Sequence, residues 1–409
     1  MQNEYIHHGV VTDNAVVEDQ SIHLDPVSFI PEEFYHPPWQ LGNMEIWYAD
    51  VYDKSTNSVF VVQFTCGPDP LKKENVIVVS IYIYTPEKGV TSLTRHIPPE
   101  EFVISEEPYS ITIGKSTIRG YKNLCSHKAE YHLQVNIEHI LLDLDIEPVI
   151  TSWLPFGAKV TFYDRKRKGI FSWIPAIPKG KVNGSVTIGQ STLKIFNAHG
   201  YYDHTFWETG LNPPFNANLL FWDDILVSWM WLKIIQEDIK IAINEFRFRP
   251  WLSNRNIFTL MVCRGDSILF SQNHMAQLNR TPLTHDQPKR KAGELNLSLT
   301  INDMDLKLNI TPTILLRYQD MLEYVNPLSR SLIRMIFGSP TAFYTLALAD
   351  VYLTCPTETI VLTKAMAFYE SMVLSARPSR FEDRIRKFVS RKISGWTFRS
   401  HDAPHFRIN

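Results

Sequence analysis

The stretch Gly200-Tyr-Tyr-Asp-His-Thr-Phe-Trp-Glu-Thr-Gly210 places two acids, one imidazole and four aromatic rings between two glycines. Read as a β-strand, it puts successive side chains on opposite faces. Asp203 and His204 can then share a wall only if a bulge intervenes. Such a strand can line a cavity, or it can be a buried and hydrogen-bonded structural cluster. One face holds Tyr201, Asp203, Thr205 and Trp207, and the other holds Tyr202, His204, Phe206 and Glu208.

Segments on both sides of this stretch carry the patterns of β-strands. Residues 58–66 and 75–84 are runs of β-branched and aromatic residues, and residues 130–138 alternate apolar and polar side chains. Gly189-Gln190 separates two further alternating runs, as expected of a two-residue hairpin turn. Many short strands joined by turns are typical of all-β sandwiches or barrels. In the second half, the strand pattern returns at 239–244, 295–301, 304–310 and 365–373.

The length of 409 residues exceeds that of one ordinary hydrophobic core, so two β domains are expected. The break at Asn212-Pro-Pro214 divides the predicted strands into roughly equal halves. Within the second half, the polar and basic run 277–293 predicts an exposed loop, and 326–337 predicts a short helix. The expected parts are an N-terminal arm (1–42), an N-terminal β domain (43–212), a C-terminal β domain (213–375) and a tail (376–409).

The overall composition argues against several classes of function. With 41 Lys and Arg against 43 Asp and Glu, the formal net charge is -2, so no general attraction to nucleic acid is expected. The four cysteines are scattered without a Cys-x-x-Cys pair, which argues against a zinc site and a disulfide framework. The first residues contain no apolar signal region, and the apolar stretch 217–235 is interrupted by Asp223 and Asp224. We therefore expect a cytoplasmic protein that binds no metal and does not span a membrane.

Five motifs occur in an order that resembles a known family. They are Glu45-Ile-Trp-Tyr48, Phe171-Ser-Trp-Ile-Pro-Ala-Ile-Pro178, Val182-Asn-Gly184, Gly200-Tyr-Tyr-Asp-His204 and Trp229-Met-Trp231. This series resembles the lipocalin-like hydroxyneurosporene synthase family, which includes the carotenoid 1,2-hydratases and has the fungal decalin-forming Diels-Alderases as distant relatives. The resemblance covers residues 25–375 in outline and is specific for 171–231. The family's central motif is G-Y-H-D-H-N-W-G, which Gly200, Tyr201, Asp203 and His204 match and from which Tyr202, Thr205, Phe206 and Trp207 depart.

The strand pattern and this resemblance together predict an all-β chain with two tandem lipocalin-like (calycin-type) β-barrels or sandwiches. The resemblance implies an enzyme that needs no cofactor and acts on a hydrophobic polyene or isoprenoid in a barrel cavity. The expected reaction is acid-promoted hydration or cyclisation at a C=C bond. The expected catalytic residues are Asp203, His204 and Tyr202. The expected substrate-binding residues are Tyr201, Phe206, Trp207, Trp222, Trp229 and Trp231.

Asp203 is the candidate general acid. Protonating an unactivated C=C bond produces a carbocation, so the acid must stay protonated near neutral pH. Burial among apolar groups raises the pKa of a carboxyl group, and Asp203 lies between Tyr201 and Trp207 on its predicted face. Aromatic faces stabilise a cation by roughly 0.5–2 kcal/mol per contact. Two other interpretations stay open: a Diels-Alderase-like pericyclase, which needs shape and a hydrogen bond to a carbonyl, and a non-catalytic carrier of a lipid or pigment.

The tail carries the pattern of an amphipathic helix. Between Arg380 and Ile393, apolar residues fall on one helical stripe, with basic residues between them. Such a helix can lie on an anionic membrane surface, or it can pack its stripe against a β-sheet. Peripheral membrane contact through residues 378–393 is therefore one expectation, besides the hydrophobic substrate. The stripe consists of Phe381, Ile385, Phe388, Val389 and Ile393.

Overall fold

The structure is a computed structural model that describes most of the two predicted β regions. The described residues are 9–11, 22–23, 44–69, 74–106, 109–122, 129–150, 152–164, 167–210, 226–248, 256–276, 279–281, 283, 285–286, 291–301, 303–320, 331, 334, 340–355 and 358–373. The helix expected in the tail, nearly all of the helix expected in 326–337, and Trp222 lie outside these residues. The tail helix and its membrane contact therefore stay predictions.

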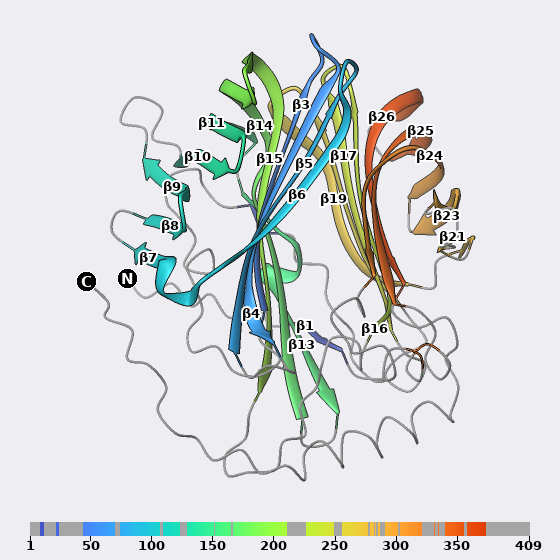
Figure 1. The fold of residues 1–409 in the computed structure, drawn as a ribbon. Coiled ribbons are helices and arrows are strands. Elements are labelled where there is room, and N and C mark those ends of the chain that lie inside the picture. The colour runs from blue at the N-terminus through green and yellow to red at the C-terminus, as the bar shows by residue number, and fades with distance from the viewer. Residues whose placement is uncertain are drawn as a thin grey trace. The chain divides into compact units, whose positions relative to one another are not determined.

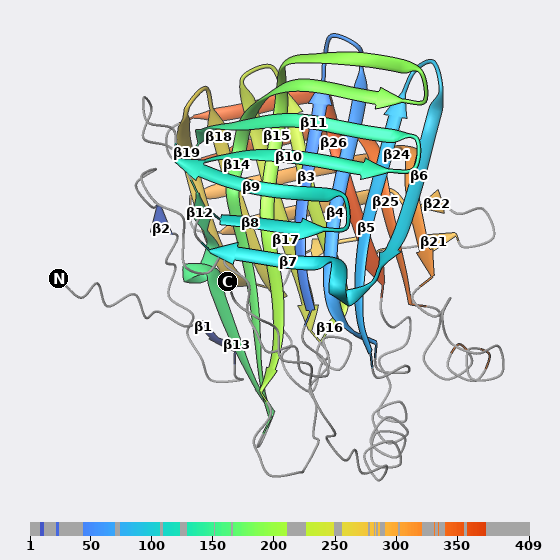
Figure 2. The same ribbon diagram turned by 60° about the vertical axis from the view of Figure 1, so that its left-hand side comes forward.

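The chain divides into two compact units, and the domain boundary expected at residues 212 and 213 lies outside the described residues. Unit 1 contains strands β3 to β15. All of these except β12, which pairs with β2, form one antiparallel sheet in the order β6-β5-β4-β3-β15-β14-β11-β10-β9-β8-β7, with β13 beside β14. In Figure 2, β7 to β11 run across the direction of β3 to β5, so the sheet wraps around its core. The strands are β3 (Met44–Asp53), β4 (Ser58–Asp69), β5 (Glu74–Thr85), β6 (Gly89–Ile97), β7 (Phe102–Glu106), β8 (Tyr109–Ile113), β9 (Ser116–Lys122), β10 (Ala129–Ile137), β11 (Ile140–Ile150), β12 (Trp153–Leu154), β13 (Lys159–Asp164), β14 (Arg167–Ile188) and β15 (Ser191–Gly210), preceded along the chain by β1 (Gly9–Val11) and β2 (Ile22–His23).

The predicted alternation of apolar and polar residues builds the core of unit 1. Leu133 and Val135 of β10 face the core, and so do Leu142 and Leu144 of β11, while Asp143 between them is exposed. Because side chains alternate along a strand, one sequence pattern provides both a buried face and a solvated face. Each fully buried aliphatic side chain contributes on the order of 1.5–3 kcal/mol.

Strands β14 and β15 are longer than the sequence patterns indicated. The hairpin at Gly189-Gln190 is confirmed, but residues 191–210 form one strand of 20 residues instead of two separate segments. The pairing of β14 with β15 shifts register between Ile174 and Ile177, between Ile177 and Gly180, and between Val182 and Gly184. Such bulges bend a long strand without ending it, so one strand can follow the curvature of the sheet.

Unit 2 repeats the same scheme with fewer strands, in the order β19-β18-β17-β16-β26-β25-β24-β23-β20. In both units the first strand pairs with the last, β3 with β15 and β16 with β26. Figure 1 shows the curvature of β24 to β26, coloured orange to red. The strands are β16 (Leu226–Gln236), β17 (Ile239–Phe248), β18 (Asn256–Arg264), β19 (Ser267–Ala276), β20 (Asn279–Arg280), β21 (His285–Asp286), β22 (Lys291–Ala292), β23 (Leu295–Ile301), β24 (Met304–Asp320), β25 (Thr341–Thr354) and β26 (Thr359–Val373).

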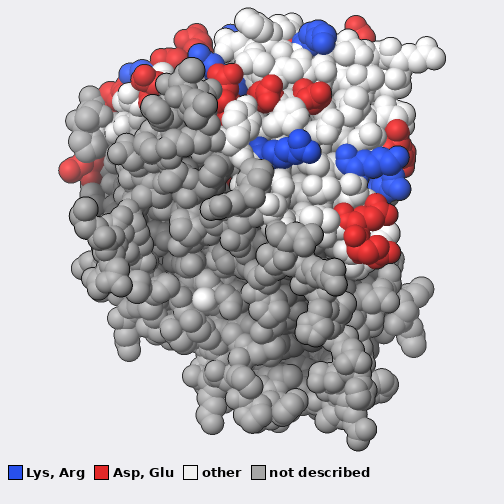
Figure 3. Space-filling model, turned by 90° about the vertical axis from the view of Figure 1, so that its left-hand side faces the viewer, with Lys and Arg blue, Asp and Glu red and all other residues white. Residues whose placement is uncertain are grey.

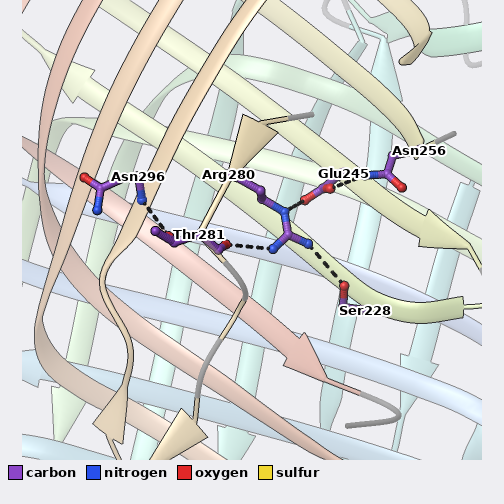
Figure 4. A network of polar contacts seen from close by, with 6 residues as sticks. All are labelled: Ser228, Glu245, Asn256, Arg280, Thr281 and Asn296. Atoms are coloured by element: carbon purple, nitrogen blue, oxygen red, sulfur yellow. Dashed lines mark hydrogen bonds and ion pairs between the residues drawn. The ribbon is translucent and has the colours of Figure 1, made fainter. Parts of the chain in front are cut away.

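The expectation that residues 277–293 form an exposed loop is wrong in part. Three two-residue strands, β20, β21 and β22, lie in this segment, and the Arg280 side chain is only 4% exposed. Figure 4 shows that Arg280 donates from Nε to Glu245 and from its two other nitrogens to the Thr281 carbonyl and the Ser228 hydroxyl. Asn256 donates a further hydrogen bond to Glu245. Arg280, which lies in a segment expected to be exposed, is therefore buried and links β20 to β16 and β17 by hydrogen bonds.

Charged side chains of both signs lie on the face of the molecule seen in Figure 3, where the described residues form no large patch of one sign. Non-specific binding of nucleic acid requires a concentrated basic surface. The described part of this face does not provide one. Among the described residues, no helix has the length and apolar character needed to cross a bilayer.

Candidate active site on strand β15

Two glycines allow close packing just before the polar residues of β15: Gly200 lies against Val182 of β14, and Gly180 of β14 lies against Glu147 of β11. Gly200 of β15 is paired with Gly180 of β14. A Cβ atom on Gly200 would lie 2.5 Å from Val182 Cγ2, and one on Gly180 would lie 2.9 Å from the Glu147 carbonyl oxygen. Both distances are shorter than real contacts allow, so neither position accepts a larger residue without movement of its neighbours. The next residues, Tyr201 to Trp207, are therefore held at a fixed place in the sheet.

Asp203 is buried and receives two hydrogen bonds on the same oxygen. The Tyr201 hydroxyl donates to Asp203 Oδ2 at 2.6 Å, and the Trp173 indole nitrogen donates to the same atom at 2.9 Å. Tyr201 is 0% exposed, Trp173 4% and Asp203 5%. The Trp153 ring packs edge-on against Trp173, with centroids 5.3 Å apart. The carboxyl group thus lies among aromatic rings with one oxygen fully engaged.

The two bonds to Oδ2 decide which oxygen carries the proton of the neutral acid. An oxygen that accepts two N–H or O–H donors behaves as the carbonyl oxygen of a carboxylic acid. The proton must then be on Oδ1, which receives no hydrogen bond from any of the described residues. The acid therefore has a fixed acceptor side and an O–H that can donate to a bound molecule.

Burial raises the pKa of Asp203 from 3.8 to about 7, although the hydrogen bonds from Tyr201 and Trp173 act in the opposite direction. Desolvation disfavours the carboxylate more than these two donors stabilise it. The carboxyl group is therefore about half protonated at neutral pH. A pKa near the working pH suits a group that must donate a proton and then recover it.

The raised pKa makes the stability of the folded chain depend on pH. Folded Asp203 keeps its proton up to a pH of about 7, whereas the unfolded chain releases it near 3.8, so stability is lost as the pH rises between these values. Each pKa unit corresponds to about 1.4 kcal/mol, so the loss is on the order of 4 kcal/mol. Asp203→Asn has no proton to lose, and we expect it to exceed the wild type in stability at about pH 8 and to equal it at about pH 4. Urea unfolding at both pH values measures this, and a difference that does not change with pH would contradict it.

His204 lies on the opposite face of β15. Its ring is 0% exposed and stacks on Trp47, with centroids 4.9 Å apart and planes inclined by 7°. Its Nε2 atom is 3.7 Å from Glu45 Oε1, which is close enough for an ion pair when the imidazole is protonated. Cys66 pairs with Glu45 across the strands, and burial, helped by the Glu45 charge, raises the pKa of its thiol. Asp203 and His204 are therefore separate groups, as the alternation of the strand predicts.

Tyr202 shares the His204 side of the strand and belongs to the hydrophobic core of unit 1. Its hydroxyl lies 3.4 Å from the Tyr109 hydroxyl, and its ring centroid is 4.4 Å from that of Tyr131. Asp203 is not part of this core. The barrel core that was expected to receive the acid therefore receives Tyr202, and the acid lies on the other side of the sheet.

The other aromatic residues predicted to bind substrate do not form one cluster among the described residues. Phe206 is buried on the His204 side, 6.0 Å from that ring. Trp207 is buried and lies 5.9 Å from Phe171, and no hydrogen bond joins it to Asp203. Trp229 and Trp231 lie on one face of β16 in unit 2, where Trp229 packs 5.4 Å from Phe246.

Sequence reasoning missed two neighbours of the polar groups. Trp173 and Glu45 both occur in the motifs of the family resemblance, yet neither was assigned a role there. The signal that identifies them is strand register. Trp173 pairs with Thr205, two positions from Asp203 on the same face of β15, and Glu45 pairs with Phe206, two positions from His204 on the other face. Register across long bulged strands cannot be read from periodicity alone.

Comparison with known proteins identifies the fold. No protein-family model and no curated protein sequence matches this chain. An AttH protein from Nitrosomonas europaea superimposes with a TM-score of 0.53 at 11% identity, over 86% of this chain and 100% of that one. Kievitone hydratase from Nectria haematococca gives a TM-score of 0.51 at 14% identity, over 91% and 97% of the two chains. CghA with Sch210972 gives 0.49 at 10% identity, over 87% and 99%.

The AttH protein and kievitone hydratase have a lipocalin-like architecture, and the chain has that fold. The all-β prediction with two tandem lipocalin-like units is confirmed within the described residues. At identities of 11% and 14% the likeness concerns the backbone only. A shared fold hosts many activities, so function must be argued from the site.

Proposed function

We propose that this protein is a cofactor-independent enzyme, related to the hydroxyneurosporene synthases, that protonates a C=C bond of a hydrophobic polyene or isoprenoid. The observation that carries the proposal is the Asp203 carboxyl group, buried and with both donors on Oδ2. The two donors fix the acid proton on Oδ1, and burial raises the pKa of the group to about 7 in spite of them. Kievitone hydratase, which has the same fold, is by its name a hydratase, and this supports the proposal.

The chemistry can be followed atom by atom at Asp203. Oδ1–H transfers its proton to one alkene carbon, and the other carbon becomes a tertiary cation. The Tyr201 hydroxyl and the Trp173 N–H already donate to Oδ2, so they stabilise the carboxylate that forms. Water then adds to the cation and returns a proton to the carboxylate, for a net gain of one water molecule. If a second C=C bond of the substrate attacks instead, a ring forms, and loss of a proton gives an isomer.

A product assay in D2O tests this proposal. We expect lycopene or neurosporene to be converted in detergent to a product that gains one water molecule, or to an isomer, with one deuterium bound to carbon. Because the acid form is active, the rate should fall about tenfold per pH unit above about pH 7. A rate that is flat or rises from pH 6 to 9 would contradict Asp203 as the acid.

A second candidate function, a Diels-Alderase-like pericyclase, is favoured by the fixed direction of the Oδ1–H donor. A donor held by Tyr201 and Trp173 can polarise a substrate carbonyl without releasing its proton. The same D2O assay distinguishes the two, since a pericyclic product takes up no deuterium. A bound polyene that is recovered unchanged would identify a carrier.

A further inference from the structure

Trp173 donates to Asp203 from the neighbouring strand, at a place where the ladder between β14 and β15 is interrupted. The register of this ladder shifts directly after Ile174, the residue that follows Trp173. Pro175 and Pro178 lie in the shifted part of β14, and a proline has no N–H to donate to a ladder. The ladder therefore fixes Trp173 on one side only, and the position of its ring depends on support from another element.

Strand β12 supplies this support. The Trp153 side chain is 0% exposed, and its ring packs edge-on against Trp173 with centroids 5.3 Å apart. The next residue, Leu154, belongs to a buried cluster that includes β14. The Ser152 hydroxyl donates to the Ala176 carbonyl of β14 at 3.1 Å. Three consecutive residues thus attach the β12 segment to β14 around Trp173 and across the interruption of the ladder.

Strand β12 is itself held by the N-terminal arm. It has only two residues, and among the described residues its one strand partner is β2 (Figure 2). The two residues of β2, Ile22–His23, pair antiparallel with Trp153 and Leu154. Backbone pairing with β2 satisfies polar groups that so short a strand cannot satisfy by itself. A series of contacts therefore runs from β2 to Trp153, then to the Trp173 indole and to Asp203 Oδ2.

We propose that β2 of the N-terminal arm and Trp153 form a brace that positions the Trp173 indole on Asp203 Oδ2. Trp153 is a positioning residue, because it contacts Trp173 and acts on the acid only through that ring. The indole N–H stabilises the carboxylate form of Asp203, so loosening the brace lets the acid keep its proton to a higher pH. The Tyr201 hydroxyl donates to the same oxygen from β15 itself and does not depend on the brace. The inference rests on the proposed role of Asp203 as an acid, but the brace can be measured without a substrate.

The test follows the pKa of Asp203 in the full-length chain by carbon NMR of carboxyl-labelled aspartate. The Asp203 signal is the one that is missing from Asp203→Asn. Trp173→Phe removes the indole N–H and should raise the pKa of Asp203 from about 7 to between about 8 and 9, the effect of one lost hydrogen bond to a charged group. Trp153→Leu keeps that N–H but removes the ring behind it, so the pKa should rise to between about 7.5 and 8. Trp153→Phe keeps an aromatic ring and should restore the wild-type value.

A second pair of variants tests the arm. Ile22→Pro combined with His23→Pro removes both N–H groups of β2, whereas Ile22→Ala combined with His23→Ala keeps them. The double-proline chain should raise the pKa of Asp203 as Trp153→Leu does, and the double-alanine chain should match the wild type. Asp50, which pairs with Tyr201 and lies on the same face as Asp203, is unchanged in all of these variants.

A pKa of Asp203 that keeps its wild-type value in Trp173→Phe, in Trp153→Leu or in the double-proline chain would overturn the proposal. So would unfolding of Trp153→Leu or of the double-proline chain, since β12 and β2 would then serve the stability of the fold and not the position of one donor. The D2O product assay separates this inference from the proposed function. If the pKa responds as expected but the wild type forms no deuterated product, the brace is supported and the proposed reaction fails. If the wild type forms that product and the pKa does not respond, the proposed reaction stands and the brace fails.

Discussion

Asp203→Asn should lower the rate of the protonation reaction by about 100- to 10,000-fold, the contribution of a positioned general acid. The amide keeps an oxygen that accepts from Tyr201 and Trp173, and its NH2 group takes the place of the Oδ1–H donor. Substrate can therefore still be held by a hydrogen bond, but no proton can be transferred. We expect the loss in kcat, with KM changed little.

The measurement is the rate of product formation at a pH of about 6, where Asp203 of the wild type is mostly protonated. Asp143→Asn is the matched control, because that carboxyl side chain is 52% exposed on β11 of the same unit. Its rate should equal that of the wild type. If Asp203→Asn keeps its full rate and its product contains no deuterium from D2O, the reaction is pericyclic and a hydrogen bond suffices. An Asp203→Asn chain that fails to fold would identify Asp203 as a structural residue.

Local patterns predicted much of the fold. Residues 130–138 alternate as expected, and the hairpin turn at Gly189-Gln190 occurs where its sequence indicates. The separation of Asp203 from His204 follows from the two-residue period of a strand, and the structure has them on opposite faces. These features depend only on residues close in sequence.

The polar neighbourhoods could not be predicted, because they depend on pairing between distant strands. Trp173 reaches Asp203 across 30 positions of the chain, through strands whose register shifts near Ile174. Arg280 lies in a polar run that is typical of exposed loops, and its burial is decided by Glu245 on another strand. Asn244 sits in an alternating segment in which an asparagine indicates a solvated face. Only its neighbours in space show that it is buried.

Arg280→Met should destabilise unit 2 by about 3–5 kcal/mol, because it leaves the Glu245 carboxylate buried without its counter-charge. The two side chains are 4% and 1% exposed, and the Arg280 Nε to Glu245 Oε2 distance is 2.6 Å. Burial already raises the pKa of Glu245, and Arg280 opposes this shift. Without the guanidinium the pKa rises further, so the folded variant holds its proton to a higher pH than the unfolded chain does. The loss of stability should therefore grow as the pH rises.

Arg264→Met is the matched control, since Arg264 pairs with Glu358 at the same distance of 2.6 Å but the two side chains are 42% and 20% exposed. An exposed pair is screened by water, so we expect a cost below about 1 kcal/mol. Urea unfolding of both variants and the wild type at about pH 5 and about pH 8 measures the two effects. Equal costs for the two arginines would mean that water reaches Glu245 in the folded chain. A cost for Arg280→Met that is the same at both pH values would mean that the loss of Arg280 does not raise the pKa of Glu245 above its value in the wild type. A larger cost at pH 8 requires that folded Glu245 keeps its proton to a higher pH in the variant than in the wild type, because the carboxylate held away from water has lost the cation that stabilised it.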